Sequence, residues 1–249
     1  MRYLAIVCYD GSNYAGYQIQ PDQITIQAVI EQALAKMHKG KPIKITASGR
    51  TDAGVHAYGQ VFHYDSELTI PELNWKKALN SLLPDDIVIL KVKKMTPSFH
   101  ARYSALKKTY QYVILNSDDP SPFEVNYSTF IAEELDVALI NEACQYLIGE
   151  HDFTAFCAAN SSVKGDKIRT IYDAFCKQDG DKLILSFTGN GFLYNMVRII
   201  VGTLIEIGQG KRPVTDLPKI INKKDRSLAG KTAPAQGLYL DHVEYETKK

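Results

Sequence analysis

The first 104 residues alternate between two patterns of apolar and polar positions, that of a β-strand and that of an α-helix. Runs of aromatic and β-branched residues between turn residues predict strands at 2–9, 42–47, 59–64 and 87–93. Apolar residues at helical spacing predict a helix from Thr25, its expected N-cap, to Gly40, and a second helix over 71–83. The second helix is expected to turn four apolar residues toward the core: Leu73, Ala78, Leu79 and Leu82.

Residues 105–249 repeat this order in outline. Strands are predicted at 105–115, 170–177, 182–187 and near the end of the chain, up to residue 246. Helices are predicted at 135–147, at 192–208 and within 211–226. The helix over 192–208 is apolar on nearly all sides and is therefore expected to be buried. We predict an α+β fold of two similar halves, residues 1–104 and 105–249, each with a mixed or antiparallel sheet backed by helices.

The composition is that of a soluble globular protein, with 45% apolar and 23% charged residues. No apolar run approaches the about 18 residues of a membrane span, and no secretory signal pattern precedes the first strand. The four cysteines have no zinc-type spacing, and Gly189-Asn190-Gly191 lacks the rest of a dinucleotide-binding loop. We therefore expect a cytoplasmic protein with no metal and no cofactor.

The net charge of +1 provides no strong overall attraction to nucleic acid, so any such surface has to come from local clusters. Three stretches are rich in Lys and Arg: 36–44, 164–169 and 211–226. Each is either a solvated face, which near the end of a helix also complements the helix dipole, or a set of phosphate contacts.

The densest group of reactive side chains lies in residues 48–57 (SGRTDAGVHA), between two predicted strands. Asp52 is the only acid there, beside Arg50 and near His56. One interpretation is a tight turn, in which Asp52 and Thr51 hydrogen-bond the local backbone. The other is a site at which the carboxylate of Asp52 takes part in chemistry.

Three further groups of side chains need an explanation. Arg198 lies inside the apolar helix and is expected to be paired, because an isolated buried charge costs several kcal/mol. Tyr110 and Tyr112 share one face of the strand over 105–115, a pattern that half-buried packing also produces. His151 and Asp152 are interpreted as a turn or capping cluster.

The segment SGRTDAGVHA resembles the catalytic loop of the TruA family of tRNA pseudouridine synthases, with Asp52 at the position of the catalytic aspartate. Four other segments resemble motifs of the same family: YDGSNYAGYQIQ (9–20), FHAR (99–102), GFLYNMVRIIVG (191–202) and APAQGL (233–238). Tyr17 stands where the family has Trp. The matches extend from Tyr9 to Leu240, over almost the whole chain.

This resemblance implies an enzyme that isomerises uridine to pseudouridine in the anticodon stem-loop of tRNA, at positions 38–40, after flipping the base out of its stem. It also implies that the two halves form one continuous bent sheet, that the active-site cleft lies between them, and that the protein is a homodimer. Asp52 would act either as a nucleophile or as a base toward the sugar; both remain open.

The resemblance also assigns roles to further residues. Arg198 would pair with Asp52 and keep it ionised, because a neighbouring cation lowers the pKa of a carboxyl group. Tyr110 would lie against the target base, with Leu238 as the opposite, apolar wall. Arg50 would fill the space left by the flipped base or hold a phosphate. Arg102 is expected to bind phosphate or to orient an acid.

Two alternatives come from other classes of protein. A non-catalytic RNA-binding protein with an RNA-recognition-like sheet would also combine sheet aromatics with basic loops, but it leaves the central Asp52 without a purpose. A nucleoside or glycoside hydrolase usually needs a second carboxylate, and none lies in the matched motifs beyond the opening turn.

Overall fold

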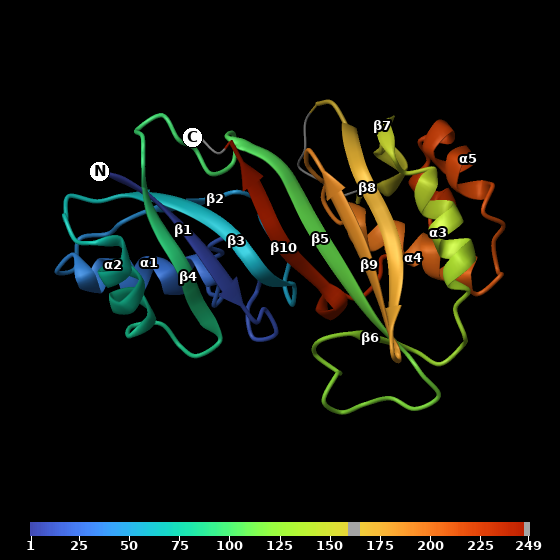
Figure 1. Cartoon of the computed structure of the whole chain (residues 1–249), viewed down its shortest axis with the longest axis horizontal. Coiled ribbons are helices and arrows are strands. Elements are labelled where there is room, and N and C mark those ends of the chain that lie inside the picture. Colours follow the sequence, from blue (N-terminus) through green and yellow to red (C-terminus); the bar gives the residue numbers. More distant parts are fainter. Residues whose placement is uncertain (159–164, 247–249) are drawn as a thin grey trace. The chain divides into compact units, whose positions relative to one another are not determined.

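A computed structural model describes residues 1–158 and 165–246. The chain divides into two units, which are coloured by sequence in Figure 1. Unit 1 contains residues 1–106 together with the last strand, from residue 239 on. Unit 2 contains residues 107–238. Each unit combines helices with strands of a β-sheet, so the predicted α+β character is present in both.

Unit 1 has four long strands and one short strand: β1 (Arg2–Tyr9), β2 (Ile45–Ala47), β3 (His56–Asp65), β4 (Ile87–Met95) and β10 (Leu238–Tyr245). Their order is β4-β1-β3-β10, and β2 pairs with β3. β1 runs antiparallel to both β3 and β4, whereas β10 is parallel to β3, with Tyr239 opposite His56. The first four strands confirm the sequence prediction.

The last strand belongs to unit 1 although the sequence pattern grouped it with residues 105–249. It does so because β10 pairs with β3, from which it is separated by most of the chain. The two strands approach each other closely at Gly59 on β3, where an added Cβ would lie 2.6 Å from the Asp241 carbonyl oxygen on β10. Such a long-range pairing leaves no trace in local periodicity.

The helices of unit 1 are α1 (Ile26–Met37) and α2 (Glu72–Asn80). Thr25 caps α1 as predicted, with its hydroxyl accepting a hydrogen bond from the Ala28 amide at 3.4 Å. The predicted core face of α2 is partly wrong: Trp75 and Leu79 are buried, whereas Leu73 is 61% exposed. Trp75 and Leu79 are four residues apart and share one face, while Leu73 lies two residues before Trp75 and points the other way.

Unit 2 contains the strands β5 (Ala105–Asn116), β6 (Thr129–Ile131), β7 (Gly149–Asp152), β8 (Ile168–Asp179) and β9 (Lys182–Gly189). Their order is β5-β9-β8-β7, with antiparallel neighbours, and β6 runs parallel to β5. The predicted β8–β9 hairpin is confirmed. The short strands β6 and β7 were not predicted, because three or four residues carry too little periodicity.

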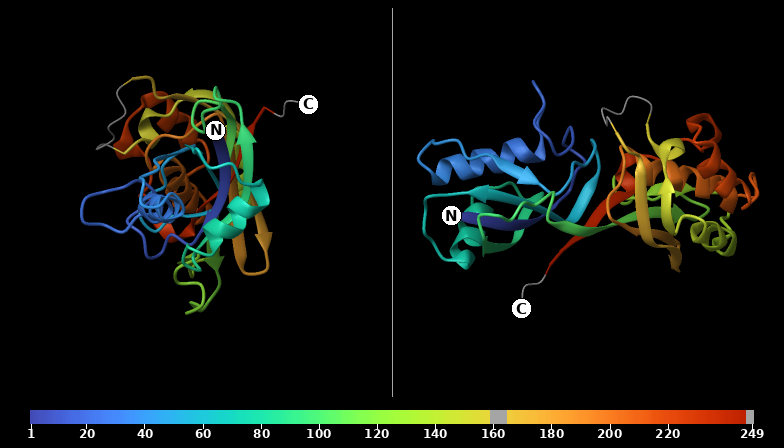
Figure 2. Two further views of the ribbon diagram at one scale, coloured as in Figure 1. Left: turned by 90° about the vertical axis from the view of Figure 1, so that its left-hand side faces the viewer. Right: turned by 90° about the horizontal axis from the view of Figure 1, so that it is seen from above.

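The helices of unit 2 are α3 (Val137–Gln145), α4 (Met196–Gly208) and α5 (Asp216–Lys223). Figure 2 shows them gathered on one side of the β8–β9 hairpin. Almost every residue of α4 is buried, as its apolar sequence predicted. Three 3-10 turns complete the unit: Thr154–Phe156, Arg226–Leu228 and Ala235–Gly237. Among the described residues, no helix is both long enough and apolar enough to cross a bilayer.

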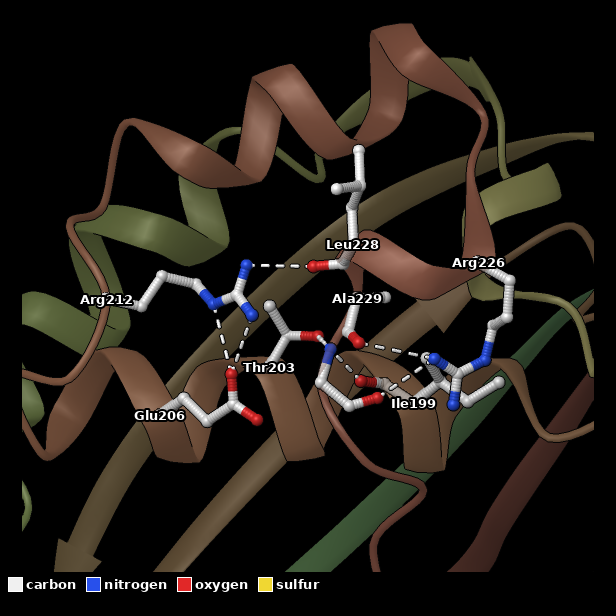
Figure 3. Close-up of polar contacts among 8 residues, drawn as sticks. Ile199, Thr203, Glu206, Arg212, Arg226, Leu228 and Ala229 are labelled. Carbon is white, nitrogen blue, oxygen red and sulfur yellow. Dashed lines mark hydrogen bonds and ion pairs between the residues drawn. The ribbon is translucent and has the colours of Figure 1, made fainter.

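Helix α4 packs directly against the backbone of residues 230–233. A Cβ added to Gly202 would lie 1.7 Å from the Lys231 carbonyl oxygen, so only glycine allows this approach. The neighbouring Thr203 hydroxyl accepts a hydrogen bond from the Gly230 amide at 2.9 Å and donates one to the Ile199 carbonyl at 2.9 Å (Figure 3). This contact fixes the segment that leads to the APAQGL motif.

Gly202→Ala is expected to lower the free energy of unfolding by at least about 3 kcal/mol, because the new methyl group overlaps backbone that cannot move aside. The matched control is Gly208→Ala in the same helix, where the Cβ would meet side chains instead of backbone: Ile140 at 2.8 Å and Leu135 at 3.4 Å. The gain in helix propensity, about 1 kcal/mol, offsets much of that overlap. Urea titrations measure both; equal losses would contradict the proposed backbone clash.

Candidate active site

The loop that joins β2 to β3 carries Asp52 in a tight turn, in which the Val55 amide donates a hydrogen bond to the Asp52 carbonyl at 3.1 Å. The Asp52 side chain is partly accessible and Arg50 is exposed. The expected turn is present, but this bond uses the backbone carbonyl of Asp52 and the Thr51 hydroxyl bonds Tyr9 instead of local backbone. The turn also leaves the Asp52 carboxylate accessible to a ligand. A turn at this place does not exclude a chemical role for Asp52.

The segment over 9–20 packs against this loop and is hydrogen-bonded to its backbone. The Tyr17 amide donates to the Thr51 carbonyl at 3.0 Å, and the Gly54 amide donates to the Tyr14 carbonyl at 3.4 Å. Gly16 has a φ of +95°, and a Cβ there would lie 2.8 Å from the Thr51 carbonyl oxygen. Two of the matched motifs, far apart in sequence, thus form one packed structure in unit 1.

His56 closes the motif and is 2% exposed. Its Nδ1 lies 3.1 Å from the Gly11 amide and 3.1 Å from an Asp10 carboxylate oxygen. The ring stacks on Tyr239 at 4.7 Å, and Tyr239 in turn stacks on Tyr58 at 4.9 Å. His56 therefore ties the loop to β10 and to the turn after β1.

The FHAR motif packs on the same unit. The Ala101 amide donates to His63 Nδ1 at 3.1 Å, and His100 Nδ1 accepts from the Arg102 amide at 3.2 Å. Both histidines thus hold backbone. The Arg102 side chain is exposed and lies over the ring of Tyr103 at 5.8 Å. Arg102 is therefore accessible to a phosphate, as its predicted role requires.

In unit 2, hydrogen bonds hold the Arg198 side chain. Its Nε donates to the Ala233 carbonyl at 2.7 Å, and its Nη1 donates to the Asn195 side-chain oxygen at 3.0 Å. Asn195 has a φ of 59°, a left-handed conformation that brings its side chain to the start of α4. The structure thus joins the motifs at 191–202 and 233–238 through Arg198.

The other predicted residues of unit 2 lie on strands. Tyr110 on β5 is 8% exposed, and its ring meets Phe192 edge to face at 5.1 Å. Leu238 is 6% exposed. Tyr112 anchors the motif before Leu238, because its hydroxyl donates to the Pro234 carbonyl at 2.8 Å. Asp52, Arg50 and Arg102 belong to unit 1, so the pairing of Arg198 with Asp52 stays a prediction.

The basic stretch over 211–226 is bound up in contacts within unit 2. Arg212 pairs with Glu206 at 2.8 Å and also donates to the Leu228 carbonyl at 2.8 Å, while Arg226 donates to the Ala229 and Gly230 carbonyls (Figure 3). Further ion pairs join three lysines to carboxylates: Lys211–Glu133, Lys219–Asp216 and Lys224–Asp152. Much of this stretch therefore has a structural role.

Of the other two basic stretches, the structure describes 36–44 in full and 164–169 from residue 165 on. Lys41 pairs with Glu67 at 2.8 Å, and Lys164 lies outside the described residues. Asp152, which was interpreted as part of a turn cluster, accepts hydrogen bonds from the amide and the hydroxyl of Thr154. Within the described ranges, no group of three or more His, Cys, Asp or Glu residues could hold a metal ion.

A family model described as tRNA pseudouridine synthase matches residues 5–104 and 143–246. The chain therefore belongs to the tRNA pseudouridine synthase family, which confirms the resemblance of the Asp52 loop and the predicted fold class.

Three relatives named tRNA pseudouridine synthase A agree over nearly the full length. The protein of Oceanobacillus iheyensis is 55% identical over 245 residues, which cover 98% of this chain and 97% of the relative. Those of Anoxybacillus flavithermus and Geobacillus kaustophilus are each 51% identical, covering 98% of this chain and 99% and 95% of theirs. The crystal structure of a Cbf5-Nop10-Gar1 complex matches with a TM-score of 0.34 and 13% identity, over 81% of this chain and 54% of that chain.

The pKa of His63 predicts how stability depends on pH. Burial, reinforced by the nearby charge of Arg2, lowers this pKa from 6.5 to about 4. The unfolded chain therefore binds a proton below pH 6.5 that the folded chain does not bind until about pH 4. The free energy of unfolding should be highest above this window and fall as pH decreases through it, by up to about 3 kcal/mol.

Denaturant titrations between the two pKa values of His63 check this expectation. His63→Asn keeps a hydrogen-bond acceptor for the Ala101 amide but cannot titrate, so its stability should fall less steeply than that of the wild type. His242→Asn is the control, because the His242 side chain is 51% exposed. Equal slopes for wild type and His63→Asn would contradict the assignment.

Proposed function

We propose that this protein converts uridine to pseudouridine in tRNA, within the anticodon stem-loop at positions 38–40. Two findings support this proposal: membership of the family, and 51–55% identity to the three relatives over 98% of this chain. The observation that carries it is the loop of Asp52. Its single carboxylate is partly accessible, and the turn that contains it is hydrogen-bonded to a second matched motif, the segment over 9–20.

In the proposed reaction the bond between N1 of uracil and C1′ of the ribose breaks. The base turns, and a new bond forms between C5 and C1′. C5 then loses its proton and N1 gains one, so the reaction involves no net oxidation or reduction. The ionised Asp52 acts at the sugar, either as a nucleophile at C1′ or as a base. Arg198 is proposed to keep that carboxylate charged and oriented.

The target uridine has to leave its stem before it can reach Asp52, at a cost of a few kcal/mol. We propose that Arg50 fills the vacated space or holds a phosphate, and that Arg102 binds phosphate. Tyr110 and Leu238 would enclose the uracil. Both are largely buried, as expected of side chains that contact a base rather than solvent.

The homodimer and the cytoplasmic location implied by the resemblance also belong to this proposal. Light scattering tests the first, and a monomer at micromolar concentration would contradict it.

Asp52→Asn is expected to lower turnover by at least about 10³-fold, or about 4 kcal/mol of barrier, because an amide can neither attack C1′ nor take a proton. Folding and tRNA affinity should be retained, since amide and carboxylate have nearly the same shape. Chromatographic detection of pseudouridine in unmodified tRNA measures turnover. It also separates the proposal from both alternatives, since neither a hydrolase nor a silent RNA-binding protein produces pseudouridine. Activity within about tenfold of wild type would rule out the proposed role of Asp52.

Tyr110→Phe distinguishes two roles of the tyrosine. The C5 proton has to leave after the new carbon–carbon bond forms, and a phenol beside the base could relay it. If so, Tyr110→Phe should lower the single-turnover rate by at least about 10²-fold with little change in tRNA affinity.

Tyr110→Leu serves as the comparison, since it also removes the ring and with it about 1–3 kcal/mol of stacking. The contact with Phe192 needs only a ring, so Tyr110→Phe should not disturb the packing. A near-wild-type rate for Tyr110→Phe would leave the tyrosine with a stacking role alone.

A further inference from the structure

A buried amide lies beneath the loop of Asp52. Gln60 on β3 is 0% exposed. Its side-chain oxygen accepts from the Ser48 hydroxyl at 2.7 Å and from the Val61 amide at 3.1 Å, and its nitrogen donates to the Gly49 carbonyl at 2.9 Å. The backbone N–H of Val61 can only donate, so the side-chain oxygen of Gln60 has to face it. The side-chain amide of Gln60 therefore has a single allowed orientation.

Tyr9, at the end of β1, is a second buried side chain that reaches the loop. Tyr9 is 3% exposed, and its hydroxyl lies 2.7 Å from the Thr51 hydroxyl. Burial raises the pKa of Tyr9 well above its ordinary value, so the hydroxyl keeps its proton. Tyr9 therefore bonds the residue that directly precedes Asp52.

Together these two side chains hold three of the four residues that precede Asp52: Ser48, Gly49 and Thr51. We propose that Tyr9 and Gln60 are positioning residues, which fix the backbone of the loop so that the Asp52 carboxylate stands at the correct place relative to the ribose. The inference rests on the proposed function of Asp52. A displacement of about 1 Å in a reacting group can cost about 10²-fold in rate.

A matched control lies beside Tyr9. Tyr17 is 2% exposed, and its ring centre is 6.2 Å from that of Tyr9. Its backbone amide supports Thr51, yet within the described part of the chain its hydroxyl has no hydrogen-bond partner. Tyr9→Phe and Tyr17→Phe thus remove the same oxygen from neighbouring buried rings, and only the first removal breaks a link to the loop.

The experiment measures the single-turnover rate of pseudouridine formation, tRNA affinity and the melting temperature of each variant. Tyr9→Phe is expected to lower the rate by about 10-fold to 100-fold while tRNA affinity changes less than about twofold, because the affinity depends on phosphate contacts elsewhere. Tyr17→Phe should retain the wild-type rate.

Thr51 provides a test from the other end of the link. Thr51→Val loses the hydroxyl and should be as slow as Tyr9→Phe, whereas Thr51→Ser keeps the hydroxyl and should recover most of the rate. The double variant Tyr9→Phe/Thr51→Val should be no slower than either single variant, since both break one link.

Leu79→Ala is the control for a general loss of stability. It truncates a buried residue of α2 and does not change the hydrogen bonds of the loop. It should lower the melting temperature without lowering the rate measured well below that temperature. If wild type makes no pseudouridine, the proposed function fails. If wild type is active and Tyr9→Phe is equally fast, or if Leu79→Ala is as slow as Tyr9→Phe, the positioning role is overturned and the function stands.

Discussion

The loop of Asp52 depends on one physical constraint, the need of a buried amide to satisfy all its hydrogen bonds. A polar group withdrawn from water is costly unless it is paired, so Gln60 can lie at 0% exposure only where Ser48, Gly49 and Val61 provide hydrogen bonds. Those partners come from the loop and from β3, and Tyr9 on β1 adds a bond to Thr51. The same bonds that satisfy the buried amide therefore hold the loop of Asp52 to the sheet.

In unit 2, close packing of backbone against backbone has a comparable role: it holds residues 230–233 against α4. Gly202 lets residues 230–233 approach α4, Thr203 bonds the Gly230 amide, and Arg198 bonds the Ala233 carbonyl. The arginines of the basic stretch that follows α4 add to this contact through carbonyl oxygens and Glu206. Cations that sequence alone offers as phosphate contacts are here partly committed to structure, which accords with a net charge of only +1.

Local patterns predicted most elements because period and turn chemistry act over short distances. The strand over 2–9, the Thr25 cap and the buried α4 are of this kind. The face of α2 was partly wrong because Leu73 and Leu79 look alike in sequence, while the position of Trp75 decides which side is covered. Gln60 was missed, although a glutamine inside the apolar run GQVFHY is a signal: a polar residue on a core strand has to find partners.

By itself, the sequence determined the family, the Asp52 loop and the succession of strands and helices, because motif identity and hydrophobic period are properties of neighbouring residues. Only the tertiary structure decided that β10 returns to β3, that Tyr9 reaches Thr51, and that Arg198 bonds the Ala233 carbonyl. These contacts join residues 35 to more than 180 positions apart. Their partners are selected by packing and by the requirement that buried polar groups be satisfied, which no local pattern records.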